Sequence, residues 1–252
     1  MSATRIVALR RYPVKGLSPE DLASVDLEAG RPIAGDRAFA VENGPSGFDP
    51  ARPAKLPKTR FLCLMRNARL AGLRTRYDDG RLTIERGGEL AIEADLRSSD
   101  GRDQVEAWLS DFMGEERRGP LQVLPAPQGH TFSDTARGVV SLISHGSVAA
   151  VADMMGRPVD PLRFRGNIEI DGAEAWAELG WVGRELRIGD VRLKVTDRTV
   201  RCAATEVDPT TAERDLPIPR TLMKTLGHAD CGVYAEVVAP GRIAVGDPVE
   251  LA

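Results

Sequence analysis

Short apolar segments that end at glycine, proline or aspartate recur along most of this chain. This pattern restricts the fold more than any other feature of the sequence. Strand character is found at residues 6–9, 24–27, 37–41, 60–66, 82–84, 90–92, 121–124, 139–143, 168–170, 185–188, 191–195, 200–205, 232–238 and 248–251. A hairpin is expected where Gly87-Gly88 separates two of these segments. Regularly spaced short strands predict barrel-like sheets rather than alternating β/α units.

Helical periodicity is found in two segments only. Between Asp103 and Met113 the apolar residues fall on one face of a helix, and Gly114 follows as an end signal. Residues 147–155 predict a second helix that ends at Gly156. We therefore predict a strand-rich α+β fold with few helices.

Two proline-rich stretches interrupt this pattern. Residues 42–58 contain too many prolines and glycines for a strand, so a long loop is expected there. Residues 119–129 contain three further prolines. A length of 252 residues with 42% hydrophobic and 28% charged residues is enough for two globular domains. We place them at residues 1–120 and 121–252.

Charge and cysteine content exclude several classes of protein. The net charge of −3 lacks the basic footprint of a dedicated nucleic-acid binder. Apolar runs are too short for a membrane span or a signal peptide. Three cysteines cannot form a disulfide scaffold or hold a four-thiolate iron–sulfur cluster, and they favour a reducing cytoplasm. Phosphate-loop, dinucleotide-binding, serine-hydrolase and HExxH motifs are absent from the sequence.

Cys202 differs from the other two cysteines by its context. Arg198 and Arg201 are close to it in sequence, which favours a reactive thiolate. The alternative interpretation is a small core residue, because free cysteine is often buried. Cys63 lies within an apolar run and is expected in the core, and Cys231 is expected to be structural.

Several basic residues adjoin glycines at expected turns. Lys15 precedes Gly16, Arg37 follows Gly35-Asp36, and Arg163 and Arg165 precede Gly166. Cations at the mouths of loops suit a buried phosphate, because charge-assisted hydrogen bonds offset its desolvation. Solvated surface arginines are the alternative interpretation.

These segments together resemble a known family. Residues 12–16 (YPVKG) and 35–37 (GDR) resemble the N-terminal beta-barrel domain that precedes a MOSC domain. Residues 163–168 (RFRGNI), 201–209 (RCAATEVDP) and 241–247 (GRIAVGD) resemble the MOSC beta-barrel domain itself. The sequence departs from the family pattern at Gly16, Gly166 and Val200.

The resemblance implies a bound molybdenum cofactor in its molybdopterin form, with Cys202 as the metal ligand. Lys15 and Arg37 match residues that contact the pterin phosphate. The residues that match the holders of the pterin are Ser133, Asp134, Thr135, Arg165 and Asn167, and Arg163 and Arg201 are further expected cofactor-binding residues.

The family implies an activity as well. Its members are similar to the mitochondrial amidoxime-reducing component and its bacterial counterparts, which reduce N-hydroxylated compounds. A small N-hydroxylated substrate and electrons from a separate ferredoxin or flavoprotein are therefore expected, with Asp134 or Asp230 as candidate proton carriers. No nucleic acid and no membrane partner is expected, nor is pyridoxal phosphate binding, because nothing resembles an aminotransferase.

Two alternatives stay open. The Cys202 thiol could carry sulfur, or the protein could carry the cofactor, in either case without turnover. The chain could also be a barrel that has lost its cofactor and serves in protein contacts.

Overall fold

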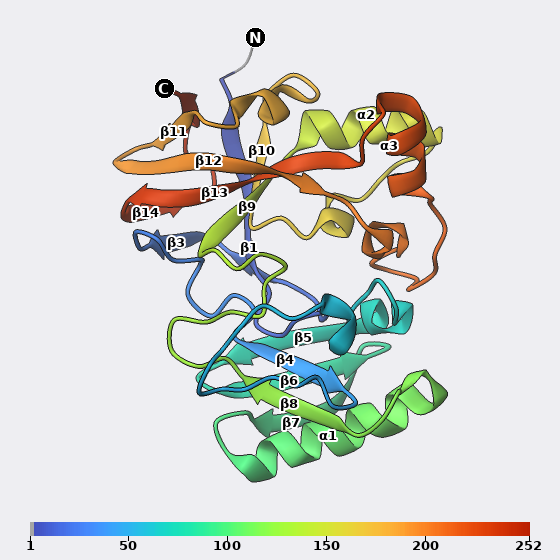
Figure 1. The fold of residues 1–252 in the computed structure, drawn as a ribbon. Helices are drawn as coiled ribbons and strands as arrows, with labels where there is room; N and C mark the ends of the chain where they lie inside the picture. The colour runs from blue at the N-terminus through green and yellow to red at the C-terminus, as the bar shows by residue number, and fades with distance from the viewer. Residues whose placement is uncertain (1–2) are drawn as a thin grey trace.

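The computed structural model describes residues 3–252, and in this range the chain forms fifteen strands and three α-helices (Figure 1). The helices are α1 (Ser99–Met113), α2 (His145–Met155) and α3 (Ile218–Leu226). The strands are β1 (Arg5–Arg11), β2 (Glu20–Leu22), β3 (Ser24–Leu27), β4 (Phe39–Asn43), β5 (Leu73–Asp78), β6 (Arg81–Arg86), β7 (Glu89–Asp95), β8 (Leu121–Pro125), β9 (Val139–Ser144), β10 (Ile168–Asp171), β11 (Glu185–Ile188), β12 (Val191–Val200), β13 (Asp230–Ala239), β14 (Gly241–Ala244) and β15 (Glu250–Leu251). Short 3-10 turns are η1 (Lys58–Arg60), η2 (Ala68–Gly72), η3 (Gly114–Glu116), η4 (Pro161–Phe164), η5 (Ala177–Trp181) and η6 (Ala203–Glu206).

One curled sheet of eight strands dominates the upper body in Figure 1. Its strand order is β15-β11-β12-β13-β9-β10-β1-β2, and β9 and β10 are its one parallel pair within the described residues. The alternating apolar residues of these strands point into a common core that includes Ile6, Leu193 and Val233. The first two strands of the chain therefore complete a sheet whose other strands all follow residue 138.

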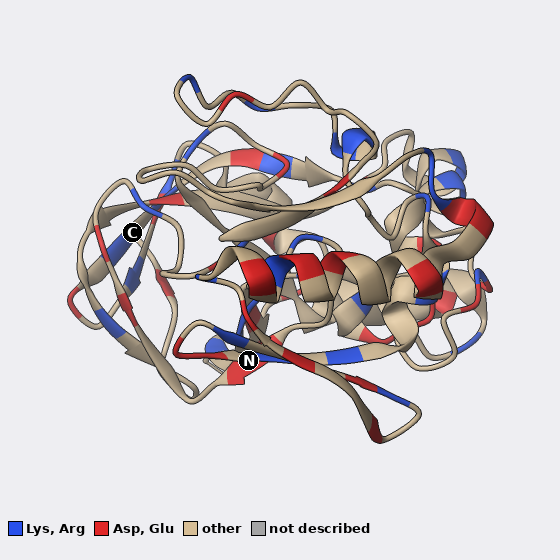
Figure 2. Cartoon of the chain, turned by 90° about the horizontal axis from the view of Figure 1, so that it is seen from below, with Lys and Arg blue, Asp and Glu red and all other residues tan. Residues whose placement is uncertain are grey.

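The lower body holds the β5-β6-β7 meander, the β4-β8 pair and α1. Helix α1 buries Val105, Leu109 and Met113 against these strands, because the three residues lie on one face at helical spacing. Its opposite face carries acidic and basic residues, as Figure 2 shows from below. This body has its own hydrophobic core.

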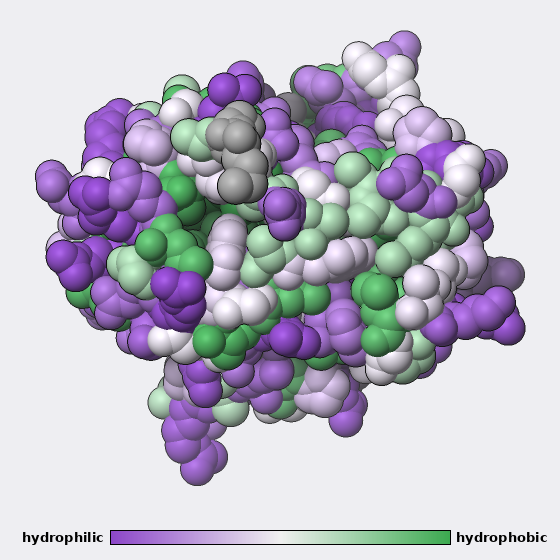
Figure 3. Space-filling view, turned by 90° about the horizontal axis from the view of Figure 1, so that it is seen from above, coloured by the Kyte–Doolittle hydropathy of each residue, from purple (hydrophilic) through white to green (hydrophobic). Residues whose placement is uncertain are grey.

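A third, smaller core lies under the other two helices. Val148 and Val151 of α2 pack with Ile218 and Leu222 of α3. Helices α2 and α3 lie at the top of the molecule in Figure 1. Figure 3 views it from above, and patches of hydrophobic residues are visible there among hydrophilic ones. Among residues 3–252, no helix has the length and apolar character needed to cross a membrane.

The predicted fold class is confirmed, and so are several of its elements. The hairpin of β6 and β7 turns at Gly87-Gly88, and residues 44–57 form a loop without helix or strand. Helix α1 starts four residues earlier than predicted, because the Oγ of Ser98 accepts a hydrogen bond from the N–H of Gly101 at 3.0 Å.

Two predicted strands are wrong. Residues 60–66 contain one isolated bridge, from Phe61 to Glu42, and then a turn at 64–66, because the N–H groups of Arg66 and Asn67 both donate to the carbonyl of Cys63. Residues 200–205 also leave the sheet after Val200, where the N–H and Oγ1 of Thr205 both bind the Cys202 carbonyl and start η6. Strands β2, β5 and β14 and helix α3 were missed; α3 begins between Pro217 and Pro219.

The division after residue 120 stays a prediction. Strand pairing crosses that position, since β8 pairs with β4 and β1 pairs with β10.

One ion pair at the start of α2 makes stability depend on pH. His145 Nε2 lies 2.8 Å from Oε2 of Glu169, and this hydrogen bond raises the pKa of His145. A histidine whose pKa is raised on folding contributes its full stabilisation below its pKa in the unfolded chain, about 6.5. This stabilisation is lost as the pH rises through its pKa in the folded protein. We expect His145→Gln to destabilise the protein to urea more at about pH 5.5 than at about pH 8.5.

His130→Gln is the matched control. Burial lowers the pKa of His130, so its pH effect has the opposite sign. An effect of His145→Gln that is equal at both pH values would contradict this assignment.

Candidate functional site

A cleft lies between the two bodies, and most of its walls are loops. The lower body contributes Lys15, the Asp36-Arg37 turn and Lys58. The upper body contributes the turn after η4 and the end of β12, where Cys202 lies two residues after Val200. The residues of the predicted site that line this cleft are Lys15, Arg37, Ser133, Asp134, Thr135, Arg163, Arg165, Asn167, Arg201 and Cys202. Their proposed roles stay predictions.

Asp230 is not among the lining residues. Its carboxylate lies 3.8 Å from Arg198 Nη1 and 3.6 Å from His228 Nδ1 at the start of β13. The structure therefore does not bring it together with the rest of the predicted site.

Two lysines hold Asp134 between them. Lys15 Nζ donates to Oδ1 at 2.6 Å, and Lys58 Nζ donates to Oδ2 at 2.9 Å. Burial disfavours the ionised form of Asp134, but the two ammonium groups outweigh it and hold the pKa below its ordinary value. Asp134 is therefore a carboxylate at neutral pH.

The two lysines respond differently to their surroundings. Burial dominates at Lys15 and lowers its pKa, although Asp134 opposes this shift. At Lys58 burial also acts to lower the pKa, but the charges of Asp134 and Cys202 outweigh it and raise the pKa. Lys58 is also the side chain that meets the thiol, since its Nζ lies 3.4 Å from Cys202 Sγ.

Sequence reasoning missed Lys58. It lies at the end of the proline-rich loop, 144 positions before Cys202, and no local pattern connects the two.

The buried ring of Tyr12 separates two guanidinium groups. Arg37 lies 4.4 Å and Arg165 lies 4.2 Å from the ring centroid. Burial opposes the charge of Arg37, but its ion pair with Asp36 outweighs this and raises the pKa. Arg165 pairs with no carboxylate among residues 3–252, and burial lowers its pKa to about 10.

Arg201 is a second cation without a counter-charge in the described chain. Its Nε donates to the Cys231 carbonyl at 2.6 Å and its Nη1 to the Phe164 carbonyl at 2.8 Å. Its Nη2 is buried without a hydrogen-bond partner among residues 3–252. Arg163 differs, because Asp208 and Asp215 lie 2.7 and 2.8 Å from its Nη2 and neutralise its charge.

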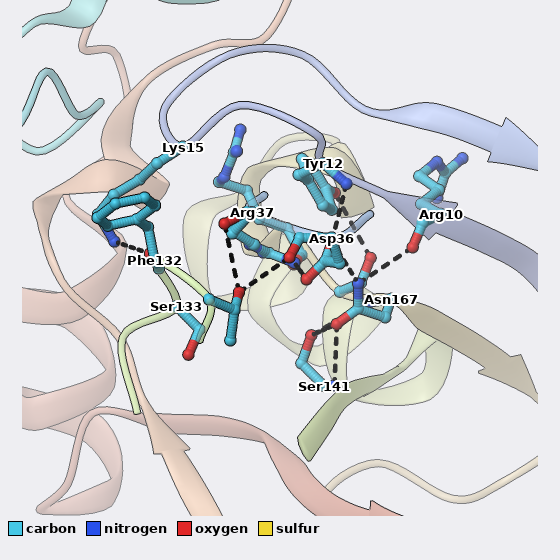
Figure 4. Close-up of polar contacts among 12 residues, drawn as sticks. Arg10, Tyr12, Lys15, Asp36, Arg37, Phe132, Ser133, Ser141 and Asn167 are labelled. Atoms are coloured by element: carbon cyan, nitrogen blue, oxygen red, sulfur yellow. Dashed lines mark hydrogen bonds and ion pairs between the residues drawn. The ribbon is translucent and has the colours of Figure 1, made fainter. Parts of the chain in front are cut away.

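Asn167 joins the two bodies through its side chain (Figure 4). Its Oδ1 accepts from the backbone N–H and hydroxyl of Ser141 at 3.1 and 2.8 Å. Its Nδ2 donates at 3.1 Å to the Arg10 carbonyl and to Oδ1 of Asp36, which also accepts from the Tyr12 N–H. This network fixes the turn that carries Arg37, and all the hydrogen-bonding groups of the Asn167 side chain are engaged within the protein.

The three thiols have different environments. Cys231 is fully buried in the small helical core, and burial raises its pKa to about 12. Cys63 contributes to the cleft wall but is 6% exposed, and burial raises its pKa. Cys202 is half-buried and has the lysine contact described above. It is the best placed of the three to bind a ligand.

The donor set fits an anionic group that brings its own metal. Within the part of the chain that the structure describes, six basic side chains but only two carboxylates line the cleft, and two of the six have no ion-pair partner. No cluster of three or more His, Cys, Asp or Glu residues that could hold a metal occurs in residues 3–252. A metal bound through the single sulfur of Cys202 therefore needs further ligands from a cofactor, and soft sulfur ligands suit a molybdenum dithiolene. The residues present fit the phosphate, pterin and metal of that cofactor.

Comparison with known proteins covers nearly the whole chain. The MOSC N-terminal beta barrel domain matches residues 3–116, and the MOSC domain matches residues 127–250. Mitochondrial amidoxime-reducing component 1 of Homo sapiens is 31% identical over 182 residues, which are 60% of this chain and 53% of that protein. Mitochondrial amidoxime reducing component 2 of Rattus norvegicus is 27% identical over 184 residues, 62% of this chain and 53% of that protein.

The chain thus spans about half the length of these curated relatives. Among solved structures, the YUAD protein of Bacillus subtilis aligns with 99% of this chain and 96% of its own at a TM-score of 0.46 and 14% identity. A likeness at that level supports no further conclusion.

Proposed function

Because the chain belongs to the MOSC domain family, with a MOSC N-terminal beta barrel domain and distant kinship to amidoxime-reducing components, we propose that it is a molybdenum-cofactor-dependent reductase of N-hydroxylated compounds. The observation that carries the proposal is the cleft in which the Cys202 thiol opens beside Lys58 and which is also lined by Arg165 and Arg201, two arginines without an ion-pair partner in the described residues. When bound, the cofactor would supply the two-electron reduction of the N–O bond, with the oxygen leaving as water.

The residues of the chain would bind and orient this group. Cys202 Sγ would ligate the metal. Lys15 and Arg37 would bind the phosphate, on the side of Asp134 that Lys15 contacts. Arg165 and Arg201 would contribute the positive charge that the buried anion needs. Lys15 is only 8% exposed, and exclusion of water from such a group strengthens its ion pairs.

Asp134 would position the two lysines rather than deliver protons. Its pKa is held below the ordinary range, so it has no proton to give at neutral pH.

Electrons would come from a separate ferredoxin or flavoprotein. The three cysteines are free thiols in different environments, and they cannot form a four-thiolate cluster. We propose that the donor docks at the cleft mouth beside Val200, which is 69% exposed. Free thiols also suit a reducing cytoplasm, which we propose as the location.

Metal content and turnover together test the proposal. The protein, purified from a host that makes the cofactor, is expected to contain about one molybdenum per chain and to reduce an aromatic amidoxime with a chemical electron donor. Molybdenum without turnover of amidoximes, hydroxylamines or N-hydroxylated bases would instead favour a carrier. Protein from this host without molybdenum would contradict the reductase and a carrier of the cofactor.

The carrier is retained as the second candidate because of one similarity. Molybdenum cofactor sulfurase of Drosophila mojavensis is 31% identical over 134 residues, which are 50% of this chain and 16% of that protein. In that case the Cys202 thiol would carry sulfur, and mass analysis of the isolated protein would show a persulfide on Cys202.

A further inference from the structure

Lys58 places an ammonium group at the open, sulfur-bearing end of the cleft. Its Nζ donates to Asp134 Oδ2 at 2.9 Å and to Cys202 Sγ at 3.4 Å. An ammonium group has three donors, and the third has no acceptor within residues 3–252. Because 31% of the side chain is exposed and it lines the cleft, this donor is open to a bound molecule.

Lys15 occupies the other side of the same carboxylate and is more enclosed. Its side chain is 10% exposed, and its Nζ also donates to the Phe132 carbonyl at 2.8 Å. Asp134 thus separates a lysine at the closed end from a lysine beside the thiol. The two therefore meet a ligand from different sides of Asp134.

A lysine in this position distinguishes ligands by charge. Its ammonium is a compact point charge that binds an acceptor oxygen without the paired geometry that arginine requires. A charge-assisted hydrogen bond to an anionic oxygen is about twice as strong as one between neutral groups. A cationic group in the same place would be repelled.

We propose that Lys58 is the substrate-orienting residue of the cleft, donating to a negatively charged oxygen brought beside Cys202 Sγ. The site then favours N–O substrates whose oxygen carries the charge, such as aromatic N-oxides, over substrates with a cationic N–O group, such as N-hydroxyguanidines. The identity of the substrate rests on the proposed function, whereas the charge selection by Lys58 does not.

Alkylation of Cys202 in the full chain prepared without cofactor measures this charge selection directly. Iodoacetate and iodoacetamide transfer similar groups to the same sulfur and differ by one negative charge. The ratio of their rate constants therefore reports the charge near Sγ and cancels the reactivity of the thiol itself. Peptide mass spectrometry assigns the label to Cys202.

Lys58→Met is expected to lower the iodoacetate-to-iodoacetamide ratio about fourfold, the effect of one unit charge about 5 Å away in a water-exposed site. Lys58→Gln should lower it equally, and Lys58→Arg should keep it near the wild-type value. Lys55→Met is the matched control, because Lys55 is exposed on the same loop and lies outside the cleft lining. A ratio that is unchanged in both Lys58→Met and Lys58→Gln would overturn the proposal.

Turnover of the molybdenum-loaded protein gives the second measurement. Lys58→Met should raise KM for an aromatic N-oxide about tenfold, with kcat changed less, while KM for an N-hydroxyguanidine stays level or falls. Equal KM changes for both substrates would overturn the role in substrate choice. If the wild-type protein turns over no N–O compound, the proposed function fails, and the alkylation ratio still decides whether Lys58 selects anions.

Discussion

Replacing Cys202 by serine is expected to lower N–O reduction at least ~100-fold and to change the absorption spectrum of the metal centre. The thiol is the one soft ligand of the chain that opens beside Lys58 in the cleft, and a serine hydroxyl is a harder ligand that stays protonated. The side chains are nearly the same size, so the fold should be retained. Metal analysis, the spectrum and the rate with a chemical electron donor measure the result.

Cys63→Ala is the matched control for this substitution. Cys63 belongs to the same cleft wall, but it is 6% exposed and its pKa is raised by burial. Its replacement should leave the rate within about threefold of wild type. A Cys202→Ser protein that keeps its molybdenum, its spectrum and its rate would exclude Cys202 as the ligand.

Arg165→Met is expected to change cofactor retention and protein stability in opposite directions. The buried guanidinium has no carboxylate partner in the described chain, and burial lowers its pKa to about 10. Keeping that charge therefore costs folding free energy in the protein without cofactor. An anionic cofactor would provide the missing counter-charge. Loss of the guanidinium in the variant should therefore weaken cofactor retention about 10- to 100-fold.

The stability of the cofactor-free protein should not fall in this variant. Methionine fills most of the same volume and removes the uncompensated charge, although the 2.8 Å hydrogen bond to the Leu17 carbonyl is lost. We expect the free energy of unfolding by urea to rise by about 1 kcal/mol. Retained molybdenum after dialysis measures the other half of the prediction.

Arg86→Met controls for the loss of a stacked arginine. Arg86 lies 5.3 Å from the Phe112 ring centroid on the exposed surface of the lower body. Neither the molybdenum retained after dialysis nor the free energy of unfolding should change appreciably in this variant. Unchanged retention in Arg165→Met would contradict an anion site at this residue.

Much of the fold followed from local pattern. Alternation of apolar residues predicted most strands, and the glycines after Met113 and Met155 end α1 and α2 as expected. The failures share a cause, since residues 60–66 and 200–205 have strand composition but their backbone groups bond locally. Competition between a turn and a ladder depends on which partner strand is within reach, and an apolar run does not contain that information.

The site was predicted less evenly. Ten of the predicted site residues line one cleft, but Asp230, proposed apart from the family motifs as a proton carrier, lies outside the cleft lining. A cofactor contact of Asn167 stays a prediction, and what the sequence did not indicate is that its side chain joins the two bodies by hydrogen bonds. Lys58 had no motif to identify it.

The order of residues was sufficient for the strand-rich class, the few helices and the candidate thiol, because each depends on neighbours within about ten positions, and for the family, because its short motifs are spread along the whole chain. Folding was needed to show which cations lack counter-charges and which thiol meets a lysine. Those properties arise from contacts between residues more than a hundred positions apart, such as Lys15 with Asp134 and Lys58 with Cys202. Burial then sets the electrostatics of such contacts, because a charge removed from water needs a partner that local sequence does not specify.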